Sequence, residues 1–568
     1  MVDDLPAEDP VEPVVLAAGG GGGTMDTVRG RFPWAFDDDG RPTVPVLGGL
    51  AALALLLLLV IWIAVQGSGN DTGGNATETP AVVIGAPTED AETPVDDSTP
   101  TGFVPVPTLD PETDVTPTPQ RGGDNQRNRA PGQTPEANAD DPLANIEIGP
   151  VASTCPERCL VRFAAGGDAE RLMREARTRA SFAADGYYWA FADPRGISWI
   201  ESQADTTLVT TSTDTLGLYI TQVPPEETSD SRVSSFGEIL DSAGNWRLVQ
   251  TTSVPANVRP LTDWGYEVSK VAPPPPDQIT VVEEPTDIET IEIGSLIDDV
   301  SESTIESTMV DLVAMGSTDG SGVGTRYYTT AANMRAAEYL FTRLESYGLR
   351  VWYEDFLTWE GFLVVNVIGE VPGRDPSAIY GVMAHFDTIA DDTNVSPGAD
   401  DNASGVAASL EIARILSEFD LVHPVRIIFV NVEEVGIVGS QKFAENAVAN
   451  DIPYEGVFNL DSIGAQRQYS YVVVNGGDST GWMTDMFQRL NDAYGLNQTI
   501  NAMTNDAIVA DDNRLREVGI DSIMIGRELY GQSPYHHTSD DLIETVSVPS
   551  VAKAGALTLL CLANLAQG

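Results

Sequence analysis

One segment constrains the architecture of this chain more than any other feature. Residues 44–65 read VPVLGGLAALALLLLLVIWIAV and contain no charged residue. At about 1.5 Å per residue, a helix over this segment spans the roughly 30 Å hydrocarbon core of a bilayer. A cleaved signal peptide has a shorter apolar region nearer the N-terminus, and a buried core helix is not flanked by Gly- and Pro-rich sequence. The segment therefore predicts one transmembrane helix in contact with a lipid bilayer.

The basic residues predict the orientation of this helix. Arg29, Arg31 and Arg41 precede it, whereas no Lys or Arg follows it until Arg121. Positively charged flanks stay on the cytoplasmic side of a membrane. We therefore expect residues 1–43 to form a disordered cytoplasmic segment of a single-pass plasma-membrane protein, with the rest of the chain extracytoplasmic.

Composition divides the part beyond the membrane into a tether and two folded regions. Residues 66–150 are rich in Pro, Thr, Asp, Glu and Gly and have hardly an aromatic residue, which is typical of a disordered linker. Residues 151–275 hold many aromatic residues, and a second linker is expected over residues 276–296. The C-terminal domain then occupies residues 297–568.

Residues 151–275 are expected to form a small α+β accessory domain. Their patterns predict a helix over residues 169–181 and strands over residues 187–192, 218–223 and 246–252. Cys155 and Cys159 can pair if the compartment is oxidising. Cys561, in an apolar run near the C-terminus, is expected to be a small buried apolar residue.

The C-terminal domain alternates short apolar strands with amphipathic helices. Helices are expected over residues 330–347, 403–419 and 481–494. Strands are expected over residues 362–368, 378–384, 425–432, 456–460, 471–474 and 522–525. This alternation predicts an α/β fold with a mixed, mostly parallel central sheet sandwiched by helices. In such sheets, functional residues gather beyond the carboxyl ends of the strands.

Acidic and histidine side chains follow these predicted strands. The groups are His385 and Asp387, the pair Glu433–Glu434, Asp461, the loop pair Asp400–Asp401, and the loop pair His536–His537. If the strands are parallel, these groups converge at one edge of the sheet. The chain has only four histidines, and three of them lie in these segments. The fourth, His423, precedes a strand and is expected to be structural.

Imidazoles and carboxylates together are the ligands that bind pairs of Zn²⁺ ions at neutral pH. Two adjacent glutamates at a strand end suit a division of labour, in which one binds metal and the other is the general base. A carboxylate two residues after a ligand histidine, as Asp387 follows His385, can orient the imidazole. The pattern therefore predicts a dizinc hydrolytic site.

The same segments resemble those of the co-catalytic zinc aminopeptidase family. The motifs, in order, are Ala-His-Phe-Asp-Thr, Pro-Gly-Ala-Asp-Asp-Asn-Ala-Ser-Gly, Glu-Glu-Val-Gly-Ile-Val-Gly-Ser, Asn-Leu-Asp and His-Thr-Ser-Asp-Asp. The resemblance covers about residues 300–568. The family includes bacterial leucyl aminopeptidases and glutamate carboxypeptidase II, with glutaminyl cyclase as a relative.

The resemblance implies a role for each site residue. His385 and Asp461 would bind one zinc ion, Glu434 and His537 the other, and Asp401 would bridge the two. Glu433 would be the general base, Asp387 the partner of His385, and Asp541 a supporting acid. Either Tyr530 or Tyr535 would donate to the oxyanion. Many relatives read Ser-Asp-His where this chain has Ala510-Asp511-Asp512, so local substrate contacts are left open.

The function that follows is a zinc-dependent exopeptidase acting on peptides or proteins, specifically an aminopeptidase. A carboxypeptidase or a glutaminyl cyclase on the same fold is an alternative. A serine hydrolase is another, because Ser479 lies in a Gly-x-Ser-x-Gly pattern, and a non-catalytic binding ectodomain is a third. The net charge of -54 argues against nucleic acid as a partner.

Overall fold

The computed structural model describes Leu143 and residues 146–164, 169–176, 178–211, 215–271, 292–318, 320–465, 472–504, 508–527 and 533–567. Every described residue lies within Asn125–Gly568. The predicted cytoplasmic segment, the predicted transmembrane helix and nearly all of the predicted tether lie outside the described residues.

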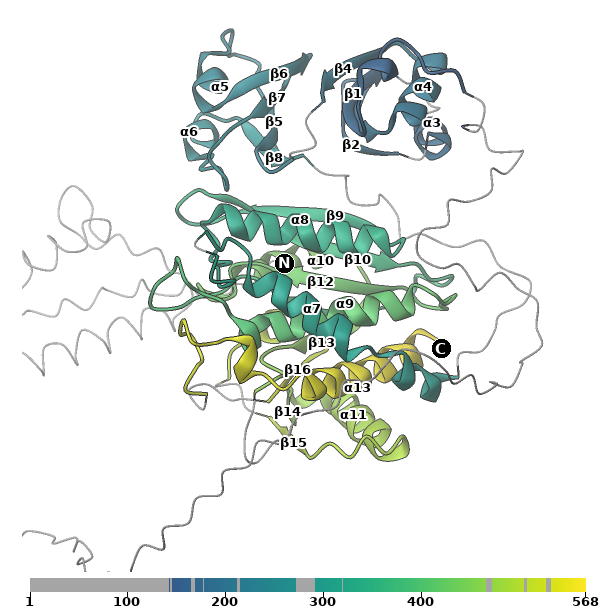
Figure 1. The fold of residues 1–568 in the computed structure, drawn as a ribbon, viewed down its shortest axis with the longest axis vertical. Coiled ribbons are helices and arrows are strands. Elements are labelled where there is room, and N and C mark those ends of the chain that lie inside the picture. The colour runs from purple at the N-terminus through teal and green to yellow at the C-terminus, as the bar shows by residue number, and fades with distance from the viewer. Residues whose placement is uncertain are drawn as a thin grey trace, which may run out of the picture. The chain divides into compact units, whose positions relative to one another are not determined.

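The region expected to be one small α+β domain holds two four-stranded sheets (Figure 1). Each sheet and its two helices form one accessory unit. The first accessory unit comprises β1 (Cys159–Ala164), α3 (Ala169–Glu175), β2 (Arg179–Ala184), β3 (Tyr187–Ala192), α4 (Pro194–Gln203) and β4 (Thr206–Thr210). The second accessory unit comprises β5 (Leu218–Gln222), α5 (Ser231–Phe236), β6 (Glu238–Ala243), β7 (Trp246–Gln250), α6 (Arg259–Thr262) and β8 (Glu267–Lys270). Strand orders β2-β3-β1-β4 and β6-β7-β5-β8 are equivalent, so the two units share one β-α-β-β-α-β topology.

One predicted element of this region is wrong in its second half. The helix expected over residues 169–181 ends at Glu175, and strand β2 begins at Arg179. Strand β2 pairs antiparallel with β3, and this pairing overrides the helix propensity of its Ala and Arg residues. The three predicted strands are confirmed as β3, β5 and β7, and Cys155 and Cys159 form a disulfide.

The C-terminal domain is built on an eight-stranded mixed sheet of order β15-β14-β16-β13-β11-β12-β10-β9 (Figure 1). The strands are β9 (Arg350–Leu357), β10 (Leu363–Val371), β11 (Ile379–His385), β12 (Val425–Val430), β13 (Tyr454–Leu460), β14 (Val472–Asn475), β15 (Ile500–Met503) and β16 (Ser522–Gly526). The central strands β12, β11, β13 and β16 are mutually parallel. The hairpin β9–β10 and strand β14 join them antiparallel, so the predicted mixed, mostly parallel sheet is confirmed.

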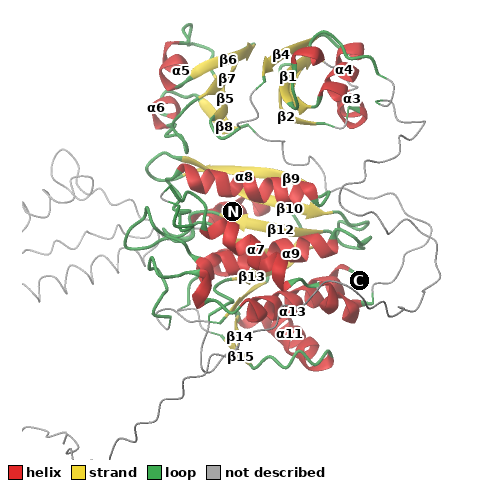
Figure 2. Ribbon diagram, viewed as in Figure 1, coloured by secondary structure: helices red, strands yellow, loops and turns green. Residues whose placement is uncertain are grey.

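Helices pack on both faces of this sheet (Figure 2). They are α7 (Glu302–Val313), α8 (Ala331–Ser346), α9 (Gly405–Leu416), α10 (Val438–Ala449), α11 (Gly481–Ala493), α12 (Asp511–Glu517) and α13 (Val548–Ala566). The Thr330 side chain caps α8 by accepting a hydrogen bond from the Asn333 N–H, as expected for a helix that starts after threonine.

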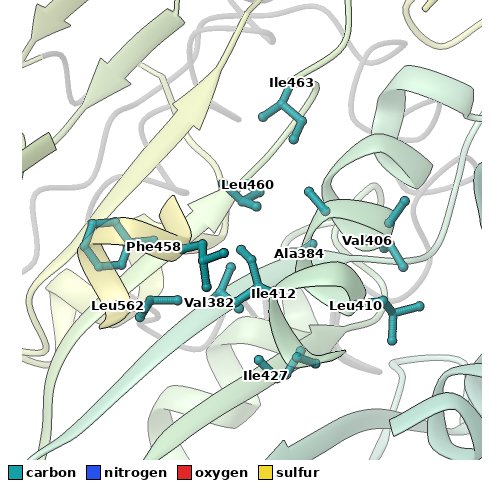
Figure 3. Close-up of a cluster of buried hydrophobic side chains, with 14 of the residues drawn as sticks. Val382, Ala384, Val406, Leu410, Ile412, Ile427, Phe458, Leu460, Ile463 and Leu562 are labelled. Atoms are coloured by element: carbon teal, nitrogen blue, oxygen red, sulfur yellow. The ribbon is translucent and has the colours of Figure 1, made fainter. Parts of the chain in front are cut away.

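Successive residues of the central strands point into different cores. In β11, Val382 and Ala384 join the larger cluster with α9 and α13, whereas Met383 joins a cluster with α10 and α12. Figure 3 shows Val382, Phe458 and Ile412 of the larger cluster beside Leu562 of α13. Strands buried on both faces explain why their sequences are unbroken apolar runs.

Among the described helices, α13 alone is long and apolar enough to cross a membrane. Its side chains are mostly buried inside the domain, and Cys561 in its middle is a fully buried free thiol. Helix α13 is therefore a core helix, and the prediction for Cys561 is confirmed.

Truncating Leu562 to Ala should lower the free energy of unfolding by about 2–5 kcal/mol, because the change leaves a cavity in the core. Chemical unfolding of the full chain in detergent, followed by circular dichroism, measures this loss. The control is Val310→Ala, since Val310 on α7 is 45% exposed and its truncation should change stability by under about 0.5 kcal/mol. Equal stability of the two variants would contradict the core assignment of α13.

Candidate metal centre

The parallel strands bring three predicted site segments to one edge of the sheet. His385 is the last residue of β11, Glu433 and Glu434 follow β12, and Asp461 directly follows β13. Strand β11 lies between β12 and β13, so these side chains project from three neighbouring strand ends. This is the convergence that the sequence pattern predicts.

Two loops complete the cluster. Asp401 lies in the kinked segment η4 (Ala399–Ser404), just before α9, and its own backbone angles, φ -109° and ψ 87°, are not helical. His536 and His537 lie in the loop between β16 and α13, and His537 has a positive φ of 57°.

The carboxylate of Asp401 faces two separate groups of ligand atoms. Its Oδ1 lies 3.2 Å from His385 Nε2, which is also 3.6 Å from Asp461 Oδ1. Its Oδ2 lies 3.4 Å from His537 Nε2, which is also 2.8 Å from Glu434 Oε2. The geometry thus matches two adjoining cation sites that share one carboxylate, with the grouping of residues that the family resemblance implies.

The neighbouring histidine also reaches this cluster. His536 Nδ1 lies 3.0 Å from Asp401 Oδ2, and the rings of His536 and His537 stack at 3.7 Å. The side-chain ligand atoms of Asp401, His536 and His537 lie within 4.8 Å of one another. Of the two histidines, His537 is the one whose Nε2 also contacts Glu434. This contact favours the prediction that His537 is the zinc ligand.

The donor set fits zinc. Glu434 Oε1 is buried and has no hydrogen-bond partner among the described residues, which leaves a carboxylate oxygen available for a cation. Asp401, Glu433 and Asp461 are each at most 8% exposed. Burying several carboxylates together is costly unless cations neutralise them, and imidazole–carboxylate sets of this kind suit Zn²⁺.

The pKa values of the acidic and histidine side chains reflect this crowding. Burial opposes the charge on Asp401, but hydrogen bonds with His385, His536 and His537 hold the pKa of Asp401 well below its usual range. Burial opposes the charge on His385 too, yet its carboxylate neighbours raise the pKa of His385 well above its usual value. Burial also raises the pKa of Glu433 well above its usual value.

Asp387 lies near His385 and also hydrogen-bonds to the backbone of Glu433 and Glu434. Its carboxylate accepts hydrogen bonds from the Glu433 N–H at 3.1 Å and the Glu434 N–H at 3.3 Å. The His385 Nδ1 is 3.7 Å from Asp387 Oδ1 and 3.3 Å from the Asp387 carbonyl oxygen. Asp387 therefore ties the end of β11 to the segment that follows β12.

A further acid and a buried arginine hold the turn that carries Asp401. Asp541 accepts hydrogen bonds from the backbone N–H groups of Asp400 and Asp401, both at 3.0 Å. Arg326 is fully buried, and its guanidinium donates to the carbonyl oxygens of Leu312, Phe386, Pro397 and Gly398. The family resemblance pointed to Asp541, but no sequence signal pointed to Arg326.

The structure adds one acid that the sequence pattern did not place in the site. Asp511 is fully buried, and its charge is among the influences that raise the pKa of Glu433. Of the two tyrosine candidates, Tyr530 lies outside the described residues and Tyr535 is 41% exposed. Ser479 is exposed, and among the described residues no histidine hydrogen-bonds to it, so the serine-hydrolase alternative gains no support.

A pocket of about 290 Å³ opens beside the cluster. Glu433, Glu434, Asp461 and both loop histidines form one part of its wall. The apolar part of the wall consists of Ile437, Ile508, Val509 and Met524. A ligand in this pocket would contact the metal-binding groups with one end and apolar side chains with the other.

Residues 366–562, within the C-terminal domain, match the family model described as Peptidase family M28. Over these residues, the match supports the family and the zinc metallopeptidase class that the motifs predict.

Two curated relatives of this chain are named as aminopeptidases. The chain is 30% identical to "Aminopeptidase YwaD" of Bacillus subtilis over 201 residues, which are 34% of this chain and 42% of that protein. It is 30% identical to an "Aminopeptidase" of Pseudomonas aeruginosa over 134 residues, which are 23% of this chain and 24% of that protein. The chain thus spans less than half the length of both relatives. Among solved structures, LapB from Legionella pneumophila is similar at 16% identity and a TM-score of 0.44, covering 72% of this chain and 100% of that one.

Replacing Asp541 with Asn should weaken zinc binding about 10- to 100-fold, because the turn that orients Asp401 loses its charged acceptor. Competition titration against a chelating dye measures the affinity. The matched control is Asp540→Asn, since Asp540 is the adjacent exposed acid and should leave the affinity unchanged. Equal affinities in the two variants would show that Asp541 does not support the metal site.

Proposed function

We propose that this chain is an aminopeptidase with two zinc ions per chain, anchored in a membrane and acting outside the cytoplasm. The observation that carries the two-ion site is the position of Asp401, whose two carboxylate oxygens face different sets of ligands. His385 and Asp461 would hold one ion, Glu434 and His537 the other, and Asp401 would bridge them.

The chemistry of the residues follows from their positions. Zinc ions bound there would lower the pKa of a coordinated water and polarise the peptide carbonyl. Glu433 lies in the pocket wall next to Glu434, a proposed zinc ligand. The Glu433 carboxylate is not among the groups that contact Asp401 or His537. It is therefore the group placed to accept the proton of the attacking water and to pass it to the departing amine.

The pocket supports a preference in the substrate. Ile437, Ile508, Val509 and Met524 offer an apolar wall next to the acidic cluster. An apolar side chain of the first residue would pack against that wall, while its free amino group would face the carboxylates.

Exchanging each of the adjacent glutamates for Gln should separate the two roles. Glu433→Gln should lower kcat by about 10²- to 10⁴-fold and keep two zinc ions, because a general base is lost and no ligand is. Glu434→Gln should lose zinc as well as activity. Elemental analysis and an aminoacyl-anilide assay measure the two effects.

Several results would contradict this assignment. Wild-type protein with fewer than one zinc per chain, or cleavage that survives chelation, would exclude a metallopeptidase. Ser479→Ala should leave kcat unchanged. Cyclisation of a Gln-initiated peptide without hydrolysis would favour the glutaminyl cyclase alternative.

The location is proposed from the apolar segment 44–65 and its basic N-terminal flank. The Cys155–Cys159 disulfide supports an oxidising compartment.

The full chain should sediment with membranes, and deletion of residues 1–65 should release it into the soluble fraction. Protease added to intact cells should digest the C-terminal domain while a cytoplasmic marker protein stays whole. Protection of the domain until the cells are lysed would reverse the proposed orientation.

A further inference from the structure

A large aromatic side chain lies exposed in the turn between β9 and β10. Trp359 is 53% exposed, although the turn around it is well ordered by hydrogen bonds between Thr358 and both Gly361 and Phe362. An exposed tryptophan on a fixed turn leaves a large apolar surface in water at a defined position, and a ligand that passes this turn can pack against it.

Trp359 lies beside the pocket wall and outside the pocket itself. A Cβ atom added to Gly436 would lie 3.9 Å from Cζ3 of the Trp359 indole. Gly436 lines the pocket two residues after Glu434. The indole is also 6.4 Å from the ring of Tyr328, whose hydroxyl donates to the neighbouring Glu360 at 3.0 Å. The exposed ring therefore borders the rim of the pocket on the side of the glutamate pair.

A segment of the second accessory unit holds this turn. The residues of segment 256–259 make four hydrogen bonds with the turn and the start of β10: Val258 N–H to Gly361 O at 2.9 Å, Leu363 N–H to Ala256 O at 3.0 Å, Asn257 Nδ2 to Glu360 O at 3.0 Å, and the Arg259 guanidinium to Trp359 O. Asn257 also forms a β-bridge with Phe362. The carbonyl of Trp359 is thus fixed by a residue from outside the peptidase domain.

We propose that Trp359 is a substrate-contacting residue that packs against an apolar side chain beyond the scissile bond, and that Arg259 positions it. This inference rests on the proposed aminopeptidase function. If the pocket receives the first residue of a peptide, the rest of the peptide must leave across the pocket rim. Trp359 is an exposed aromatic side chain beside that rim, on the side of the glutamate pair. Because segment 256–259 holds its turn, the second accessory unit shapes the binding surface for longer peptides.

The test compares two substrates in the full chain loaded with zinc. In Trp359→Ala, kcat/KM for a pentapeptide with Leu at positions two and three should fall about tenfold, mainly through KM. For leucinamide, which has only the amide nitrogen beyond the scissile bond, kcat/KM should change less than twofold. Arg259→Ala should show the same substrate-dependent pattern with a smaller loss, and Trp359→Phe should recover most of the activity.

A binding measurement gives a readout besides activity. The pentapeptide should bind Glu433→Gln protein about tenfold more tightly than it binds the Glu433→Gln/Trp359→Ala double variant. The control is Trp264→Ala, because Trp264 is 60% exposed and packs under the Arg232 guanidinium in the accessory region. This control should change neither KM nor binding.

The outcomes separate this inference from the proposed function. Equal losses on both substrates in Trp359→Ala, or no loss on either, would overturn the role of Trp359 while leaving the aminopeptidase in place. Wild-type protein that binds two zinc ions but cleaves neither substrate would overturn the proposed function itself. An Arg259→Ala effect on leucinamide equal to that on the pentapeptide would overturn the positioning role of Arg259.

Discussion

The arrangement of the metal centre depends on the contacts of the Asp401 carboxylate. One oxygen faces a ligand at the end of β11, and the other faces the loop before α13, so a single side chain joins segments that are far apart in sequence. Asp401 can do this only because its backbone is held. Asp541 fixes the amide groups of the turn, and Arg326 binds the carbonyl oxygens of Pro397 and Gly398, which directly precede it.

Parallel strands explain why much of this site follows from the sequence. His385, Glu434 and Asp461 come directly after apolar runs, and the register of β12, β11 and β13 brings those strand ends level with one another. The sequence position of a ligand-type residue just after a predicted strand therefore predicts where that residue lies in the fold. The loop residues could be assigned only from the family motifs, since nothing in the local pattern distinguishes His537 from His536 or Asp401 from Asp400.

Other features had no local signal. The hydrogen bonds of Arg326 depend on carbonyl groups from three separate segments of the chain, and no pattern near residue 326 predicts them. The duplicated β-α-β-β-α-β units were also missed, because their likeness lies in strand order rather than in matching residues. Strand β2 was assigned to a helix because propensity is local, whereas its pairing with β3 is not.

The two hydrogen bonds of Asp387 have a consequence for how this centre can change. The Asp387 carboxylate accepts a hydrogen bond from the backbone N–H of both the proposed base, Glu433, and a proposed metal ligand, Glu434. A shift of Asp387 therefore moves both groups together. Metal affinity and proton transfer therefore cannot be adjusted separately at Asp387, and an engineer who wishes to alter one alone must work through the side chains that face each glutamate.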